Sequence, residues 1–177
     1  DLFISNNRLR MMSLRYFNPI GAHQSALIGE LPVGKPNNLL PFITQTAAGI
    51  HEKLVIFGKD YPTVDGTCVR DYIHVVDLAE AHVKAIDHLL SLQNGCHEVV
   101  NVGTGKGTSV LELVHAFEEE NNMKLNYTFG PKRSGDVIEI YANVDYAHSL
   151  LGWKATRDIN DGVRDAWKWE KSIRNIQ

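Results

Sequence analysis

Two apolar strands constrain the fold of this chain more than any other feature. The segments Met11–Phe17 and Glu98–Val102 are largely apolar, as are parallel strands that are covered on both faces of a sheet. The chain supplies few further strands to flank them. We therefore expect both strands to belong to a larger doubly wound sheet whose first strands lie upstream of Asp1. The 177 residues alone would then expose a sheet edge and an apolar face.

Strands and helices alternate along the rest of the chain, which predicts the α/β class. Short apolar runs predict further strands at 54–57, 69–75 and 124–129. Helical spacing predicts helices at 39–50, 144–151 and 159–173, and two more that begin at capping boxes. These boxes are Asp77 with Glu80 and Ser109 with Glu112. In the helix that begins at Asp77, the expected buried residues are Leu78, Ala81, Ala85, Ile86 and Leu89. The segment 21–36, rich in Gly and Pro, is expected to be a long loop.

The composition narrows the class of protein. Hydrophobic residues make up 44% and charged residues 22% of the chain, which is typical of a folded globular domain. A net charge of -3 gives no basic surface for nucleic acid or an anionic membrane. No apolar stretch is long enough to cross a bilayer. Cys68 and Cys96 are too few for a disulfide framework, and the eight histidines show no paired ligand spacing. We expect a cytoplasmic protein without a metal.

An ordered set of motifs connects the chain to a known family. Leu14–His23 reads LRYFNPIGAH and strongly resembles the middle of UDP-glucose (UDP-galactose) 4-epimerases, which are extended short-chain dehydrogenases/reductases. Further matching motifs follow in the family's order at Pro36–Pro41, Ile56–Tyr61, Asp65–Thr67, Val69–Ala79, Asn101–Gly103 and Arg133–Asp136. Each motif alone is weak, whereas the ordered set covers nearly the whole chain and is highly specific.

Two signatures of this family are missing from the 177 residues. The first is the Gly-x-x-Gly-x-x-Gly turn that holds the NAD pyrophosphate at a helix N-terminus. The second is Tyr-x-x-x-Lys, because none of the six tyrosines has a lysine four residues later. The glycine-rich run Gly103–Gly107 follows a strand, but Thr108 occupies the place of the third glycine, so we interpret this run as a structural turn. The chain is therefore expected to be the carboxy-terminal half, inactive alone.

The resemblance implies a domain division and a function. Residues 1–20 would end the Rossmann-type dinucleotide-binding domain. Residues 21–177 would mainly form a smaller α/β UDP-sugar-binding domain, with 69–103 returning a strand and a helix to the Rossmann sheet. The complete protein would interconvert UDP-glucose and UDP-galactose through a 4-keto sugar with tightly bound NAD, and would form a homodimer. Two alternatives stay open: a related nucleotide-sugar dehydratase or decarboxylase, and a non-catalytic nucleotide-binding fragment.

Such a reaction needs the UDP held firmly while the hexose turns, so the anchors should gather on the nucleotide. The resemblance assigns Arg70 and Arg133 to the diphosphate, which suits guanidinium groups that can pair two phosphate oxygens at once. Each could instead be a surface ion-pair residue. Asp136 would accept hydrogen bonds from the ribose hydroxyls, or it is a turn aspartate after Gly135.

The same resemblance assigns the remaining contacts. Asn38 and Leu39, at a predicted helix start, are assigned to the substrate. Asn38 would bind the phosphates or serve as a simple N-cap, and both can hold together. Asn18 would contact the phosphates or the hexose. The backbone of Val55, Ile56 and Phe57 would contact the edge of the uracil ring. Tyr16, Phe17 and Pro19 would lie near the NAD. Tyr72 would line the pocket or lie in the core.

One position departs from the family in an informative way. Many epimerases carry Tyr or Cys four residues after the ribose aspartate, and this chain has Ile140 there. Because isoleucine is smaller than tyrosine, the hexose pocket would have room for an N-acetyl group. We therefore expect UDP-N-acetylhexosamines as further substrates of the complete enzyme.

Overall fold

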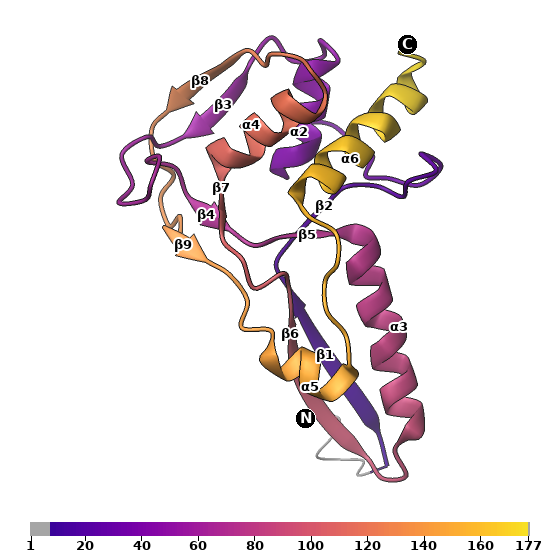
Figure 1. Ribbon diagram of the computed structural model, residues 1–177. Helices are drawn as coiled ribbons and strands as arrows, with labels where there is room; N and C mark the ends of the chain where they lie inside the picture. The colour runs from indigo at the N-terminus through magenta and orange to yellow at the C-terminus, as the bar shows by residue number, and fades with distance from the viewer. Residues whose placement is uncertain (1–7, 177) are drawn as a thin grey trace.

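The computed structural model describes residues 8–176 and contains two lobes, which Figure 1 shows one above the other. The lower lobe consists of strands β1 (Arg10–Tyr16) and β6 (Cys96–Val102) with helices α3 (Val75–Ser91) and α5 (Asp145–Leu151). The first seven residues of the predicted segment 1–20, and residue 177, lie outside the described residues. The proposed domain boundaries stay a prediction.

The lower lobe is built on one parallel strand pair. Strands β1 and β6 pair from Arg10 opposite Cys96 to Tyr16 opposite Val102, while α3 packs on β1 and α5 packs on β6. Its core includes Val100, Val102 and Trp153. No residue of β1 is fully buried, and β6 is its only paired strand among residues 8–176. The exposed sheet edge expected from the sequence is therefore present in the described structure.

The upper lobe contains most of the remaining elements. Helices α2 (Leu39–Ala47), α4 (Val110–Glu120) and α6 (Ile159–Arg174) pack with the parallel pair β3 (Leu54–Phe57) and β8 (Tyr127–Gly130). A small sheet has the order β7 (Thr108–Ser109), β4 (Val69–Arg70), β9 (Glu139–Ile140). Between the lobes, β2 (Asn18–Ile20) pairs in parallel with β5 (Tyr72–His74). Four of the five strand pairings are thus parallel, which confirms the predicted α/β class.

Most predicted elements occur within a few residues of their predicted bounds, including the Ser109–Glu112 capping box. The Asp77–Glu80 box is wrong, because the N-cap of α3 is His74, whose Nδ1 accepts from the Val76 amide at 3.1 Å. Asp77 lies in the first turn, where its carboxylate accepts hydrogen bonds from Thr156 and Arg157 instead.

Two further predictions are corrected by the packing. Ile86 is 57% exposed rather than buried, because it belongs to a second apolar stripe of α3, with Val83 and Leu90, that faces away from the β1–β6 pair. Helical spacing alone cannot tell which of two stripes is covered. The strand predicted at 69–75 is divided at Asp71 into β4 and β5, and α3 already begins at Val75.

Candidate functional site

A cavity of about 700 Å³ opens where the two lobes meet. Its walls come from β2, the start of α2, β3, the strands β4 and β5, and the segment 133–136. Except for Tyr16 and Ile140, every site residue predicted above lines it: Phe17, Asn18, Pro19, Asn38, Leu39, Val55, Ile56, Phe57, Arg70, Tyr72, Arg133 and Asp136. The structure thus gathers in one cavity residues that the sequence separates by more than a hundred positions.

Two arginines contribute positive charge to the cavity. Arg70 lies 3.8 Å from the Asp136 carboxylate, measured from Nη2 to Oδ1, and its Nη1 donates to the Val69 carbonyl at 2.8 Å. The Arg133 guanidinium lies over the Phe57 ring, 3.9 Å from the centroid. Arg133 has no carboxylate within ion-pair distance among residues 8–176. One acidic and two cationic groups therefore face the cavity here, an arrangement that suits an anion with several oxygens.

The start of α2 forms a second polar wall. Asn38 occupies the N-cap position with extended backbone, but its side chain makes no capping hydrogen bond. Its amide instead donates to Glu30 at 2.8 Å. Asn38 is thus the N-cap residue that the sequence predicts, but its side chain does not cap the helix. The first turn of α2 contains no acidic residue, and Lys35 also lines the cavity, so this wall favours an anion as well.

Other parts of the cavity lining are apolar or aromatic. Val55 and Phe57 are half-buried along β3, while Ile56 between them is in the core. Tyr72 is 5% exposed, and its burial raises the pKa of its hydroxyl above the usual value, against the opposing effect of Arg70. The raised pKa favours the protonated hydroxyl of Tyr72 at neutral pH. It can pack against a ligand or donate a hydrogen bond to it.

Two predicted site residues lie outside the cavity lining. Tyr16, at the end of β1, is 53% exposed and adjacent to Phe17. Ile140, on β9, is half-exposed and stands opposite Arg70 in the strand pairing. Conversely, motif reasoning missed further lining residues, among which are Lys35 and Cys68. Both adjoin predicted motifs, so proximity to Asn38 and Arg70 was the only sequence signal that could have indicated them.

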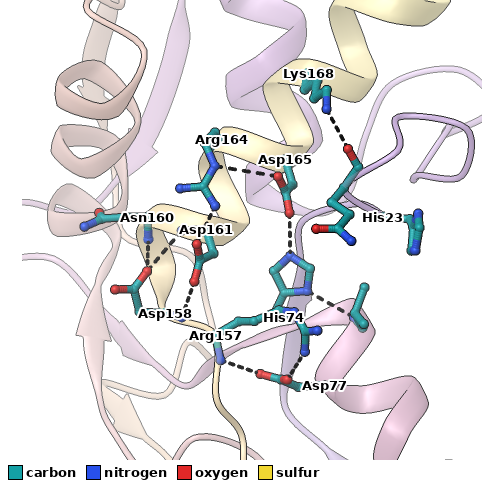
Figure 2. Close-up of polar contacts among 12 residues, drawn as sticks. His23, His74, Asp77, Arg157, Asp158, Asn160, Asp161, Arg164, Asp165 and Lys168 are labelled. Atoms are coloured by element: carbon teal, nitrogen blue, oxygen red, sulfur yellow. Dashed lines mark hydrogen bonds and ion pairs between the residues drawn. The ribbon is translucent and has the colours of Figure 1, made fainter.

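A separate polar cluster connects the two lobes away from the cavity lining, as Figure 2 shows. His74 is buried and its Nε2 lies 3.4 Å from Asp165 of α6. Burial lowers the pKa of His74, although the neighbouring Asp165 opposes that effect. Asp77 binds the backbone and side chains of Thr156 and Arg157 just before α6. This cluster fixes α3 against the α5–α6 connection.

Within residues 8–176, no group of three His, Cys, Asp or Glu side chains is placed to hold a metal ion. Both cysteines are free. No described helix has the length and apolar character needed to cross a lipid bilayer.

Comparisons with known proteins agree on one family. Residues 3–166 match the protein-family model described as GDP-mannose 4,6 dehydratase. The UDP-glucose 4-epimerase of Drosophila melanogaster is 51% identical over 99% of this chain and 50% of its own length. That of Bacillus subtilis is 48% identical over 97% of this chain and 50% of its own length.

Solved structures give the same result. The UDP-glucose 4-epimerase of Stenotrophomonas maltophila, with bound NAD and formylated UDP-arabinopyranose, superposes with a TM-score of 0.95 at 47% identity, covering 100% of this chain and 52% of that one. The Bifidobacterium longum enzyme, in complex with NAD+ and UDP, gives 0.93 at 42% identity, with 100% and 52% coverage. The chain thus spans about half the length of the relatives it matches.

Proposed function

The chain belongs to the family described by the GDP-mannose 4,6-dehydratase model, and from that premise we propose that it forms the UDP-sugar-binding half of an NAD-dependent UDP-glucose 4-epimerase. The resemblance to UDP-glucose 4-epimerases that the motifs predicted is confirmed by relatives about half identical over nearly the whole chain. The activity, substrates and partners of a complete enzyme remain proposals, because the chain spans about half of those relatives.

The observation that carries the proposal is the pair of arginines that line the cavity. Arg70 and Arg133 line the same cavity as the amino-terminal end of α2, and a diphosphate between them would receive charge-assisted hydrogen bonds from both guanidinium groups. Asp136, within 3.8 Å of Arg70, would then face the ribose hydroxyls. The backbone of Val55–Phe57 would meet the uracil edge.

The mechanism assigns binding and orientation to these residues. They hold the UDP, so that the hexose can turn about its phosphate linkage and present either face. NAD, when bound, supplies the acceptor and donor of hydride. The described residues fit one edge of that cofactor, because Phe17 and Pro19 line the cavity and Tyr16 stands exposed beside them. Tyr72 stays protonated, and no Tyr-x-x-x-Lys occurs in these 177 residues, so epimerisation needs a base from elsewhere.

A second candidate function is that of a nucleotide-sugar dehydratase, which the description of the matching family model favours. A decarboxylase would share the same scaffold and hydride chemistry. Product analysis distinguishes the three. An epimerase returns a hexose of unchanged mass with inverted C4, whereas a dehydratase loses water and a decarboxylase loses carbon dioxide. A homodimer and a cytoplasmic location stay predictions.

We extend the proposal to UDP-N-acetylhexosamines because position 140 carries isoleucine. The side chain is half-exposed on β9, opposite Arg70 and outside the cavity lining, so it would contact the hexose only beyond that lining, where isoleucine would leave more room for an N-acetyl group than tyrosine. A solved structure of the UDP-Glc/GlcNAc 4-epimerase of Campylobacter jejuni is 34% identical, with a TM-score of 0.74 and 92% of this chain covered. Absence of any turnover of UDP-N-acetylglucosamine by a complete enzyme would refute this extension, and Ile140→Tyr should abolish that turnover selectively.

The test of the main proposal is calorimetric titration with UDP. We would use this chain and a hybrid in which the amino-terminal half of the Drosophila relative precedes it. Arg133→Ala should weaken UDP binding roughly 10- to 100-fold, because a hydrogen bond to a charged group contributes about 1.5–3 kcal/mol. Arg164→Ala is the matched control, since Arg164 pairs with Asp161 and Glu120 and does not line the cavity. Absence of UDP binding by both parent proteins would refute the proposal.

A further inference from the structure

Asp71 separates two residues of the cavity but does not line it. Arg70 ends β4 and Tyr72 begins β5, and both face the cavity. Successive side chains of extended chain point to opposite sides, so Asp71 points away from the cavity. It is fully buried. A carboxylate is costly to bury unless hydrogen bonds satisfy it, so its partners indicate what it does.

The partners of Asp71 come from two distant segments. Its Oδ1 accepts from the Thr104 amide at 2.9 Å and from the Thr104 hydroxyl at 2.7 Å. Its Oδ2 accepts from the amides of Gly105 at 3.0 Å and Ala142 at 3.1 Å. One side chain therefore joins the β4–β5 junction both to the turn after β6 and to the segment that leaves β9.

The turn after β6 closes tightly around this carboxylate. A Cβ added at Gly103 would lie 2.4 Å from Asp71 Oδ2 and 2.7 Å from the Cβ of Ala142. Thr104 Oγ1 also accepts from the Lys106 amide at 3.1 Å. The glycine-rich run that superficially resembles a nucleotide loop thus surrounds an aspartate, and none of its residues lines the cavity. Thr104 and Gly105 of this run bind Asp71, which lies between the two cavity residues Arg70 and Tyr72.

The second attachment, to Ala142, bears directly on the arginines. The segment 133–140 carries Arg133, Asp136 and Ile140, and it pairs with β4 over two positions only, Val69 with Glu139 and Arg70 with Ile140. Two residues of pairing hold a strand weakly. The bond from Ala142 to Asp71 extends this attachment just beyond β9, on the side of β4 that leads into Tyr72.

We propose that Asp71 is a positioning residue of the nucleotide site, which fixes the segment of Arg133 and Asp136 relative to Arg70. The inference rests on the proposed function, in that these arginines hold a diphosphate. Bidentate pairing of a guanidinium with phosphate oxygens has a narrow geometry, and displacements of about 1 Å are costly in such sites. Loss of the Asp71 bonds should therefore affect the diphosphate more than the nucleoside.

Asp77 provides a matched control within the same chain. It is equally buried and accepts from the Thr156 amide at 3.0 Å, the Thr156 hydroxyl at 3.1 Å and the Arg157 amide at 2.9 Å, together with the Arg157 guanidinium. As Figure 2 shows, it joins α3 to the chain before α6, and none of these residues lines the cavity. Asp77 therefore represents a buried aspartate whose role is purely structural.

The experiment measures the ratio of UDP affinity to uridine affinity in the chain and in the hybrid described above. Asp71→Asn places a side-chain N–H group against the N–H and O–H donors that now bind the carboxylate. It should lower the affinity ratio about tenfold, which corresponds to the loss of one charge-assisted hydrogen bond to the diphosphate. Asp77→Asn should lower the thermal midpoint and leave the ratio unchanged. An unchanged ratio in a cooperatively folding Asp71→Asn protein would overturn the proposal.

A milder pair of variants covers the case in which Asp71→Asn does not fold. Thr104→Val removes one hydroxyl donor from Asp71 and keeps the side-chain shape, and it should lower the affinity ratio about two- to fivefold. Thr156→Val makes the same change at Asp77 and should leave the ratio unchanged. Equal ratios in these two variants would also overturn the proposal. If neither parent protein binds UDP, the proposed function itself fails, and the role of Asp71 fails with it.

Discussion

The upper and lower lobes differ in how completely each is covered. In the upper lobe, Ile43, Leu113, Phe117 and Val163 are fully buried between α2, α4, α6 and the β3–β8 pair. In the lower lobe, no residue of β1 is fully buried, and α3 exposes an apolar stripe that includes Val83 and Ile86. The cavity walls from α2 and β3 therefore rest on a closed core, whereas β1, which leads to the proposed NAD contacts, pairs with β6 alone among the described strands.

The largest expected effect tests this difference in the cores. Phe117→Ala should lower the free energy of unfolding by about 3–5 kcal/mol, because it leaves a cavity among fully buried side chains. Leu14→Ala, in β1, should cost less than half as much, since Leu14 is only partly buried. Urea denaturation can be followed by tryptophan fluorescence, because Trp167 lies edge-on to Phe117 at 5.8 Å. Equal losses in the two variants would contradict the comparison.

The elements that the sequence predicted correctly include most of the upper lobe. The upper-lobe helices, the strand pair β3–β8 and most of the cavity lining followed from apolar spacing, the Ser109–Glu112 box and the ordered motifs, because these signals are local or belong to the family. The failures depend on contacts between segments distant in sequence. Asp77 caps nothing because Thr156 and Arg157 bind it. Ile86 is exposed because another stripe of α3, with Leu78 and Ala81, packs on the lower-lobe core, which spacing along the helix alone does not reveal.

A second prediction concerns His74, which lies between the lobes. Burial lowers the pKa of His74 in the folded protein, with Arg157 acting in the same direction and Asp165 and Asp77 opposing it. The unfolded chain therefore binds the proton more readily, and folding stability is lost as the pH falls through about 6.5 toward the folded pKa. One such group contributes at most about 1.4 kcal/mol per pH unit.

The check is the free energy of unfolding at pH 7.5 and at pH 5.5 in the parent chain and in His74→Asn. Asparagine keeps a side-chain acceptor for the Val76 amide at the start of α3 but does not titrate in this range. We expect the stability difference between the two pH values to be smaller in the variant. An unchanged difference would mean that the junction between the lobes does not respond to the protonation of His74.

The smallest expected effect sharpens the assignment of the anion site to the upper lobe. Glu30 accepts the Asn38 amide at 2.8 Å and places a negative charge beside a wall that we propose receives phosphate. Glu30→Gln should tighten UDP binding about two- to threefold, because an exposed pair of this kind contributes less than about 1 kcal/mol, and the gain should shrink at high salt. Glu119→Gln, an exposed change on α4 outside the cavity lining, should leave UDP affinity unchanged. Equal gains from both variants would reflect net charge alone and would remove Asn38 from the proposed phosphate contacts.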